Sequence, residues 1–188
     1  MVNTSLVDEF WQAYCATVAD ENPGAQPDLI DQFGDHPALA DELGALVLAG
    51  TKTATCSALW EWEAEASEPP QVGTKTLVLN GAGQPICIIE TTEVQILRFN
   101  QVDAQFAYDE GEDDRTLESW RREHWKYFSR ALPKIGKQPT ENMLLVCERF
   151  NVIYPPAYSV RSRDPRSECR SDRAPDPAAI PPPARSPS

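Results

Sequence analysis

Apolar positions near the start of the chain repeat at helical spacing. The side chains that would share one helix face are Leu6, Phe10, Tyr14 and Val18. This spacing predicts a helix over residues 5–20, and Ser5 followed by Asp8 is typical of a helix start. The stretch ENPGAQPD that comes next is rich in turn-forming residues and predicts a loop.

A second amphipathic pattern begins at Pro37, a residue suited to the first turn of a helix. Its apolar face consists of Leu39, Leu43, Leu46 and Val47. Gly50 ends the pattern, because glycine readily takes the left-handed conformation that closes many helices. Lys52 is therefore predicted to follow directly on the C-terminus of this helix.

Residues 74–98 have the pattern of a β-hairpin. A short apolar stretch leads into the turn sequence NGAGQP, and a longer stretch rich in β-branched residues follows. Further along, MLLVCERFNVIY over residues 143–154 has the continuous apolar character of a buried strand.

Two helices are predicted between these strands, over residues 100–110 and 116–132. The apolar face of the second helix carries Leu117, Trp120, His124 and Phe128. Strands interleaved with helices, but too few for a doubly wound sheet, indicate an α+β protein built on a small β-barrel with helices packed outside.

The composition limits the domain organisation. With 188 residues, of which 41% are hydrophobic, the chain can bury one sizeable core. Residues 155–188 hold 9 of the 17 prolines and few aliphatic side chains, so we expect a disordered tail there. We expect a cytoplasmic protein with no membrane contact, because no apolar run could cross a bilayer and MVNTSLVDEF lacks the pattern of a signal peptide.

Charge and metal-ligating residues narrow the function. The formal net charge of -12 disfavours extended, non-specific binding to a nucleic acid. The five cysteines are an odd number without CxxC spacing, as expected of reduced thiols in a core. Only two histidines are present, which disfavours a His-rich catalytic metal centre. No cofactor is firmly implied, and a carboxylate-bound magnesium or manganese ion remains open.

The sequence GTKTATCS over residues 50–57 combines a lysine with hydroxyl side chains. Lys52 beside Thr53 and Thr55 could bind an anion or polarise a carbonyl group. Where the surroundings exclude water, desolvation would lower the pKa of Lys52 and make it a general base for Thr55. In a helical turn these two side chains would share one side, whereas in a strand they would point to opposite faces.

Two structural explanations compete with this chemistry. Lys52 can be a solvated cation near the negative end of the preceding helix. Thr53, Thr55 and Ser57 can form the outward side of a β-edge.

Four segments together resemble the ASCH family, whose fold is similar to that of the PUA RNA-binding domain. They are GTKTATCS, EGEDD at residues 110–114, WRREHWKYF at 120–128 and CERFNVIY at 147–154. The resemblance covers residues 35–154, which leaves residues 1–34 as an appended helix and loop and 155–188 as the tail. It implies an α+β, PUA-like small β-barrel surrounded by helices, with a cleft formed partly by the GTKTATCS segment.

The resemblance also implies activity on RNA or on a modified nucleoside. Related short proteins are amidohydrolases that remove the acyl group from N4-acetylcytidine, and other relatives are ribonucleases. Lys52 and Thr55 match the lysine and threonine of the amidohydrolase site, and its glutamate corresponds to Glu110 or Glu112. Ser57 stands where the short amidohydrolases have an arginine.

Other side chains are candidates for binding the substrate: Thr53, Ser57, Trp60 and His124. Trp60, Trp62, Trp120 and Trp125 could stack on a base, although aromatic residues at helical spacing also suit a core. His124 could likewise be a packing histidine on its helix. The acidic loop could cap the next helix, most naturally through Asp114, or bind magnesium or manganese.

These observations favour a nucleoside- or RNA-binding protein, with single-stranded RNA or a modified nucleoside as its partner, and a hydrolase centred on Lys52. A non-catalytic reader of the same ligands is the alternative. We expect Lys52→Ala to abolish activity with little loss of stability.

Overall fold

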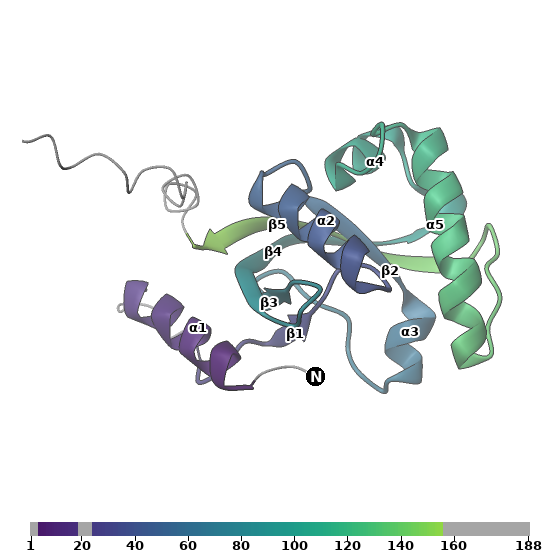
Figure 1. Cartoon of the computed structure of the whole chain (residues 1–188). Coiled ribbons are helices and arrows are strands. Elements are labelled where there is room, and N and C mark those ends of the chain that lie inside the picture. The colour runs from purple at the N-terminus through teal and green to yellow at the C-terminus, as the bar shows by residue number, and fades with distance from the viewer. Residues whose placement is uncertain (1–3, 19–23, 156–188) are drawn as a thin grey trace, which may run out of the picture.

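The computed structural model of the chain describes residues 4–18 and 24–155. Figure 1 shows a twisted sheet flanked by helices. Apart from Pro155, the tail predicted over residues 155–188 lies outside the described residues. In these two ranges no helix is both long and apolar enough to cross a membrane.

A single five-stranded sheet organises the described residues. Its strands are β1 (Leu29–Asp31), β2 (Ala54–Ala58), β3 (Lys75–Leu79), β4 (Pro85–Arg98) and β5 (Leu144–Tyr154). Their spatial order is β1-β3-β4-β5-β2. Neighbouring strands run antiparallel, except for β1, which runs parallel to β3.

The sheet curls into a half-barrel around the long strand β4. Its pairing with β5 shifts register between Ile88 and Ile89 and again between Thr91 and Glu93. Such irregularities bend a strand and increase its twist. β1 and β2 form the two edges of the sheet. The predicted α+β fold class is confirmed, with the barrel open between these edges.

Within the described ranges, five α-helices and two short 3-10 helices surround the sheet (Figure 1). They are α1 (Thr4–Thr17), α2 (Pro37–Leu48), α3 (Leu59–Ala64), α4 (Ala104–Glu110), α5 (Leu117–Ala131), η1 (Phe99–Gln101) and η2 (Leu132–Ile135). The predicted hairpin, final strand and three of the predicted helices are confirmed to within a few residues. The helix predicted over residues 100–110 is divided between η1 and α4, and β1 and α3 were not predicted.

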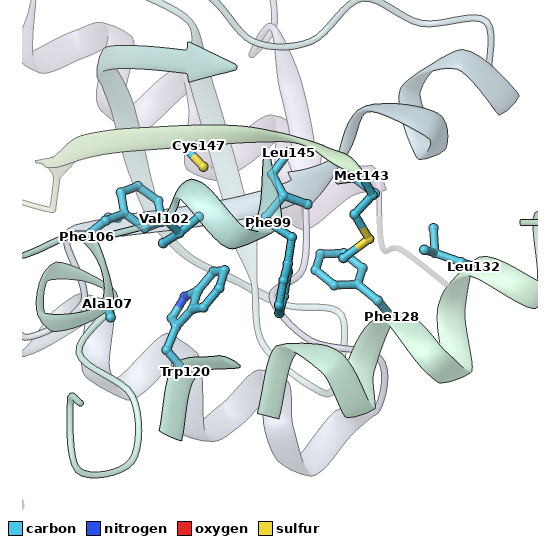
Figure 2. Close-up of a cluster of buried hydrophobic side chains, with 12 residues drawn as sticks. Phe99, Val102, Phe106, Ala107, Trp120, Phe128, Leu132, Met143, Leu145 and Cys147 are labelled. Carbon is cyan, nitrogen blue, oxygen red and sulfur yellow. The ribbon is translucent and has the colours of Figure 1, made fainter. Parts of the chain in front are cut away.

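One hydrophobic core joins α4 and α5 to β2 and β5. In Figure 2 the ring of Phe99 lies between the rings of Trp120 and Phe128, with Leu145 of β5 close by. The ring centroid of Phe99 is 5.2 Å from that of Trp120 and 6.4 Å from that of Phe128. Contacts of this kind add to the burial of apolar area and fix the helices on the sheet. They place the N-terminal half of α5 beside the end of α4.

Two smaller cores cover the rest of the sheet. Trp11 and Tyr14 of α1 pack with Leu77 and Ile88. On the concave face, Val47 of α2 belongs to a cluster with Val78, Cys87, Ile89 and Phe150. Alternate residues of a strand point to opposite faces, so β3 and β4 serve both clusters.

The end of α2 sets the position of Lys52. Pro37 begins the helix, and the ring of His36 caps it by accepting a hydrogen bond from the Leu39 N–H at 3.2 Å. Gly50 takes the predicted left-handed conformation, with φ of 70°. The N–H groups of Thr51 and Lys52 then both donate to the carbonyl of Leu46, at 2.9 and 3.1 Å. The chain thereby turns tightly from the helix into β2.

Candidate functional site

A cavity of about 570 Å³ opens where the half-barrel would close. From the β1 side it is lined by Asp31 and Phe33, and from the β2 side by Thr55 and Ser57. α4, α5 and the loop between them contribute further polar residues, and α2 and β5 add Glu42 and Glu148. Its volume lies within the range of about 300–1,000 Å³ that is usual for small-molecule sites.

Lys52 is buried in this cavity with only 1% of its surface exposed. Its Nζ donates to Glu110 Oε2 at 3.0 Å and to Glu112 Oε1 at 2.6 Å. An ammonium group has three N–H donors. The third has no hydrogen-bond partner among the described residues, and the ring centroid of Phe33 lies 5.6 Å from Nζ.

Glu110 is held from the opposite side by α5. Trp120 Nε1 donates to Glu110 Oε1 at 2.9 Å, and His124 Nε2 lies 3.4 Å from Glu110 Oε2. The His124 ring stacks on Trp120 with centroids 4.2 Å apart, and its Nδ1 lies 3.0 Å from the Trp120 carbonyl oxygen. Both carboxylate oxygens of Glu110 therefore have close polar partners, which fixes the direction from which it meets Lys52.

Lys52 and Glu110 stabilise each other's charged form. Burial lowers the pKa of Lys52, but the carboxylates of Glu110 and Glu112 together raise it by a larger amount. The net pKa of Lys52 therefore lies above its ordinary value. Burial raises the pKa of Glu110, whereas Lys52 and His124 lower it by more and hold it well below its usual range. The prediction that desolvation makes Lys52 a neutral base is therefore wrong, because two carboxylates accompany the buried amine.

Gly111 allows the acidic loop to approach Lys52. It ends α4 in the left-handed conformation, with φ of 72°. A Cβ atom at this position would lie 2.4 Å from the Thr51 carbonyl oxygen and 3.0 Å from Lys52 N. Because only glycine lacks that atom, the loop can pack against the backbone at Lys52 and present a glutamate from each side of Gly111.

Thr55 lies on β2, so the alternative of a shared helical turn with Lys52 is wrong. It lines the cavity, and its hydroxyl group makes no hydrogen bond with any residue in the described ranges. Directly opposite Thr55 in the register of β2 and β5 is Glu148. Residues opposite each other in an antiparallel pair share one face, with Cβ atoms about 4.5–5.5 Å apart.

Glu148 differs from Glu110 in its partners. It lines the same cavity, and its Oε2 accepts a hydrogen bond from Thr91 Oγ1 at 3.1 Å. Burial raises the pKa of Glu148 to about 7, while the Thr91 hydrogen bond opposes this shift and the Asp31 charge adds to it. It carries no ion pair among the described residues, so no cation offsets its burial.

Most of the predicted site residues are brought together. Lys52, Thr55, Ser57, Glu110, Glu112 and His124 all line the cavity. Thr53 does not: it is exposed, and both its N–H and its hydroxyl donate to the Asp109 carbonyl oxygen, at 2.8 and 3.2 Å. Its structural effect is to tie the segment after α2 to α4.

The tryptophans divide between cavity and core. Trp60 packs against the core beside α5 and under Lys137, so the structure does not bring this predicted binding residue to the cavity. Trp62 lines the cavity instead and donates from Nε1 to Ser57 Oγ at 2.8 Å. Trp120 belongs to the core and also lines the cavity, whereas Trp125 packs with Phe99.

Sequence reasoning missed several lining residues, including Asp31, Phe33, Cys56 and Glu148. Asp31 belongs to a strand of three residues, too short to give a periodic pattern, and Phe33 lies in the loop that follows that strand. Glu148 did leave a signal, because a carboxylate inside the apolar run LLVCERF has to find a polar environment in the fold.

The two glutamates considered as ligands for magnesium or manganese both face the Lys52 ammonium group. Among the described residues, Cys56, Glu110 and His124 bring potential ligand atoms within 4.8 Å of one another. A divalent cation bound there would have to compete with the Lys52 charge at 3.0 Å from Glu110. The donor set therefore fits the lysine better than a metal ion. Asp114 instead accepts hydrogen bonds from Thr116, the cap of α5, at 2.9 and 2.6 Å.

The cavity lining is acidic. Within the described part of the chain it contains the carboxylates of Asp31, Glu42, Glu110, Glu112, Asp113, Glu123 and Glu148, and the permanent cations of Lys52, Arg122 and Arg130. An excess of carboxylates repels phosphate groups and concentrates neutral or cationic ligands. Lys52 is moreover neutralised by its two partners, so its charge acts only at short range.

Comparisons with known proteins found one family model and similar solved structures. A model of the ASCH domain matches residues 29–154. A crystal structure of a DUF984 family protein from Enterococcus faecalis V583 is similar, with a TM-score of 0.74 and 36% sequence identity over 80% of this chain and 90% of that chain. A crystal structure of an ASCH domain from Lactobacillus crispatus JV V101 gives a TM-score of 0.72 and 34% identity over 79% and 94%. No curated protein matches the sequence.

Proposed function

The chain belongs to the ASCH domain family, and from this premise we propose that it is a hydrolase that removes the acyl group from an N-acylated nucleoside such as N4-acetylcytidine. ASCH domains have a PUA-like fold that is associated with RNA binding. The proposal places a nucleoside, as a free molecule or at an accessible position in RNA, in the cavity between β1 and β2.

One observation carries this proposal. A buried lysine, held by Glu110 at 3.0 Å and by Glu112 at 2.6 Å, lines a cavity whose wall also presents the Thr55 hydroxyl group. The two glutamates fix the ammonium group, leaving its third N–H for a ligand. A hydroxyl nucleophile and a fixed cation are the two groups that acyl transfer requires.

The chemistry assigned to each group follows from its environment. Thr55 Oγ attacks the amide carbonyl carbon, and the negative charge that develops on the carbonyl oxygen is stabilised by Lys52. A preorganised cation in a site that excludes water is effective at this task, because it needs no rearrangement during the reaction. Glu110 and His124 position Lys52 rather than touch the substrate.

The lining favours a nucleoside over a phosphodiester. A neutral base and ribose suit the volume of about 570 Å³, and the rings of Phe33, Trp62 and Tyr127 offer apolar surface for them. The acidic excess in the cavity, together with the net charge of -12, disfavours cleavage of an RNA backbone there. The raised pKa of Lys52 also leaves it unable to act as a base for a 2′-hydroxyl group.

The test is to incubate the purified full chain with N4-acetylcytidine and, separately, with single-stranded RNA, and to analyse the products by mass spectrometry. We expect cytidine and acetate in equal amounts from the first and intact RNA from the second. Thr55→Val should abolish release of acetate, while Thr92→Val, the same substitution at an exposed hydroxyl on β4, should not.

Two results would overturn the proposal. Binding of N4-acetylcytidine without turnover would indicate the non-catalytic reader, for which the full neutralisation of Lys52 by two carboxylates is the supporting observation. Cleavage of the RNA would indicate a ribonuclease.

A further inference from the structure

The cavity wall holds a second carboxyl group whose position is not explained by the Lys52 cluster. Glu148 is the cross-strand partner of Thr55, and both side chains line the cavity. Its Oε2 accepts from Thr91, whereas its Oε1 has no hydrogen-bond partner within residues 4–18 and 24–155. A half-buried carboxyl oxygen is thus free beside the proposed nucleophile.

A small recess adjoins these two residues inside the curl of the sheet. It has a volume of about 30 Å³. Side chains from all five strands line it: Leu29, Asp31, Thr55, Thr76, Val78, Ile89 and Glu148, together with Phe33 and Trp62. A water molecule needs roughly 10–15 Å³ of such space and two to four polar partners. Thr55, Glu148, Asp31 and Thr76 supply such partners, so the recess fits a water molecule.

We propose that Glu148 is the general base of the reaction, accepting a proton first from Thr55 Oγ and then from a water molecule held in the recess. This assignment rests on the proposed acyl-nucleoside hydrolysis and adds the group that moves its protons.

The two half-reactions balance in atoms and charge. In the first, the Thr55 Oγ–H proton moves to Glu148, and Oγ bonds to the acyl carbon. The carbon–nitrogen bond then breaks, and Glu148 returns the proton to the leaving amine. In the second, water gives a proton to Glu148, and the resulting hydroxide bonds to the acyl carbon. The bond to Oγ breaks, the proton passes to Oγ, and the carboxylic acid leaves.

The other titratable groups of the site are engaged elsewhere. Lys52 is protonated, and both Glu110 and Glu112 accept its hydrogen bonds. His124 contacts Glu110 and the Trp120 carbonyl group. Cys56 lies beside Glu110 and His124, with its ligand atom and theirs within 4.8 Å of one another, and burial raises the pKa of its thiol well above the ordinary value. Glu148 is the carboxyl group in direct register with Thr55.

The groups around Glu148 hold its pKa near 7. Asp31 on β1 faces it and disfavours its charge, and Lys52 lies in the same cavity before β2. On β4 the facing partner is the uncharged Thr91. Glu42 of α2 lines the same cavity, while Arg149, on the opposite face of β5, is paired with Glu93 and Asp109. With a pKa of about 7, Glu148 can exchange protons in both directions at neutral pH.

The experiment measures the pH dependence of kcat/KM for N4-acetylcytidine. We expect wild type to gain activity as pH rises, with an apparent pKa near that of Glu148, about 7. Glu148→Gln should lower kcat on the order of 10²–10⁴-fold and remove this rise, the ascending limb of the pH profile. Glu141→Gln, the same change at an exposed position, should leave the rate unchanged.

Two further variants separate a base from a merely structural residue. Thr91→Val removes the hydrogen bond that favours ionised Glu148 and should move the limb to higher pH. Asp31→Asn removes a repelling charge and should move the limb to lower pH. Opposite shifts of one limb report the titration of Glu148 itself.

The outcomes distinguish this assignment from the proposed function. If wild type releases acetate but Glu148→Gln keeps both rate and limb, the general base is another group and the hydrolase proposal stands. The same conclusion follows if the limb stays at the same pH in both Thr91→Val and Asp31→Asn. If wild type releases no acetate, the proposed function fails, and the role of Glu148 fails with it.

Discussion

Glu110, which is fully buried, and Glu148, which is half-buried, line the same cavity but have opposite acid–base properties. Glu110 is enclosed by Lys52 and His124, and its pKa is held well below the usual range. Burial without a cation raises the pKa of Glu148 to about 7. Burial disfavours the charged form in both cases, so the partners decide the outcome.

This difference divides the site into a fixed and a titratable half. In the half formed by α4, α5 and Lys52, the Lys52 ammonium group and the Glu110 carboxylate hold each other in the charged form and provide a fixed field. The half formed by β2 and β5 can bind and release a proton near pH 7. Pairs of carboxyl groups whose environments separate their pKa values are a recurrent arrangement in hydrolytic enzymes.

Replacing Lys52 should cause the largest loss of stability, because it acts on the fixed half of the site. Lys52→Met keeps the volume but leaves Glu110 buried without its main counterion. We expect a loss of about 3–5 kcal/mol in the free energy of unfolding, measured by urea denaturation. The expectation that Lys52→Ala spares stability is withdrawn, because the side chain is buried and ion-paired.

The double variant Lys52→Met with Glu110→Gln is the control for this interpretation. Neutralising the carboxylate removes the unpaired charge, so the double variant should be more stable than Lys52→Met alone. Equal stability of the two variants would contradict an ionic interaction between these residues.

A smaller loss is expected when the acidic loop is moved away from Lys52. Gly111→Ala introduces a Cβ atom 2.4 Å from the Thr51 carbonyl oxygen and imposes a left-handed conformation on alanine. The conformation alone costs about 1–2 kcal/mol, and displacement of the loop adds to it. Gly136→Ala is the matched control, since its φ of 73° is similar but no atom lies within 4 Å of the added Cβ. Equal losses of unfolding free energy would contradict the close approach.

The pH dependence of stability should contain one contribution from each carboxyl group. Because the folded pKa of Glu110 is depressed, its contribution is present above the unfolded value of 4.5 and is lost as pH falls. The folded pKa of Glu148 is raised, so its contribution is present below 4.5 and is lost as pH rises to about 7.

Glu148→Gln should remove the second contribution, on the order of 1–3 kcal/mol. The loss of stability at acid pH, which comes from Glu110, should stay unchanged. The measurement is a series of urea denaturation curves between about pH 3.5 and 8, a range of roughly one unit beyond each value. An unaltered pH profile in this variant would show that Glu148 has an ordinary pKa.

The smallest effect concerns the two tryptophans that follow β2. Trp62→Phe removes the donor to Ser57 in the cavity wall and should weaken cytidine binding by about 1 kcal/mol. Trp60→Phe changes a residue outside the cavity and should leave cytidine affinity unchanged. Isothermal titration calorimetry of both variants compares them directly, and a larger loss for Trp60→Phe would place the ligand elsewhere.

The fixed half of the site was easier to predict than the titratable half. Gly50 and the amphipathic pattern before it located Lys52 at a helix end, and the resemblance to the ASCH family supplied Thr55 and the acidic loop. The sequence left open whether Glu110 or Glu112 faces the lysine. In the structure both do, because the left-handed conformation of Gly111 lets each of them reach it.

The titratable half depends on contacts that no local pattern records. β1 has three residues, and its place beside β3 is fixed only by tertiary pairing. Thr55 and Glu148 face each other only because of the register between β2 and β5, two strands that lie far apart in the chain. Similarly, the expected attraction of Lys52 for an anionic ligand ignored the need of a buried amine for counterions.

The most direct test of the account is a carbon-detected NMR titration of the glutamate side-chain carboxyl groups, with Glu110→Gln and Glu148→Gln identifying the two signals. We predict that the Glu148 signal titrates near pH 7 and that the Glu110 signal stays in its ionised position down to the acid limit of the folded state. Titration of both signals together, near the ordinary value of 4.5, would contradict the division of the site into two halves.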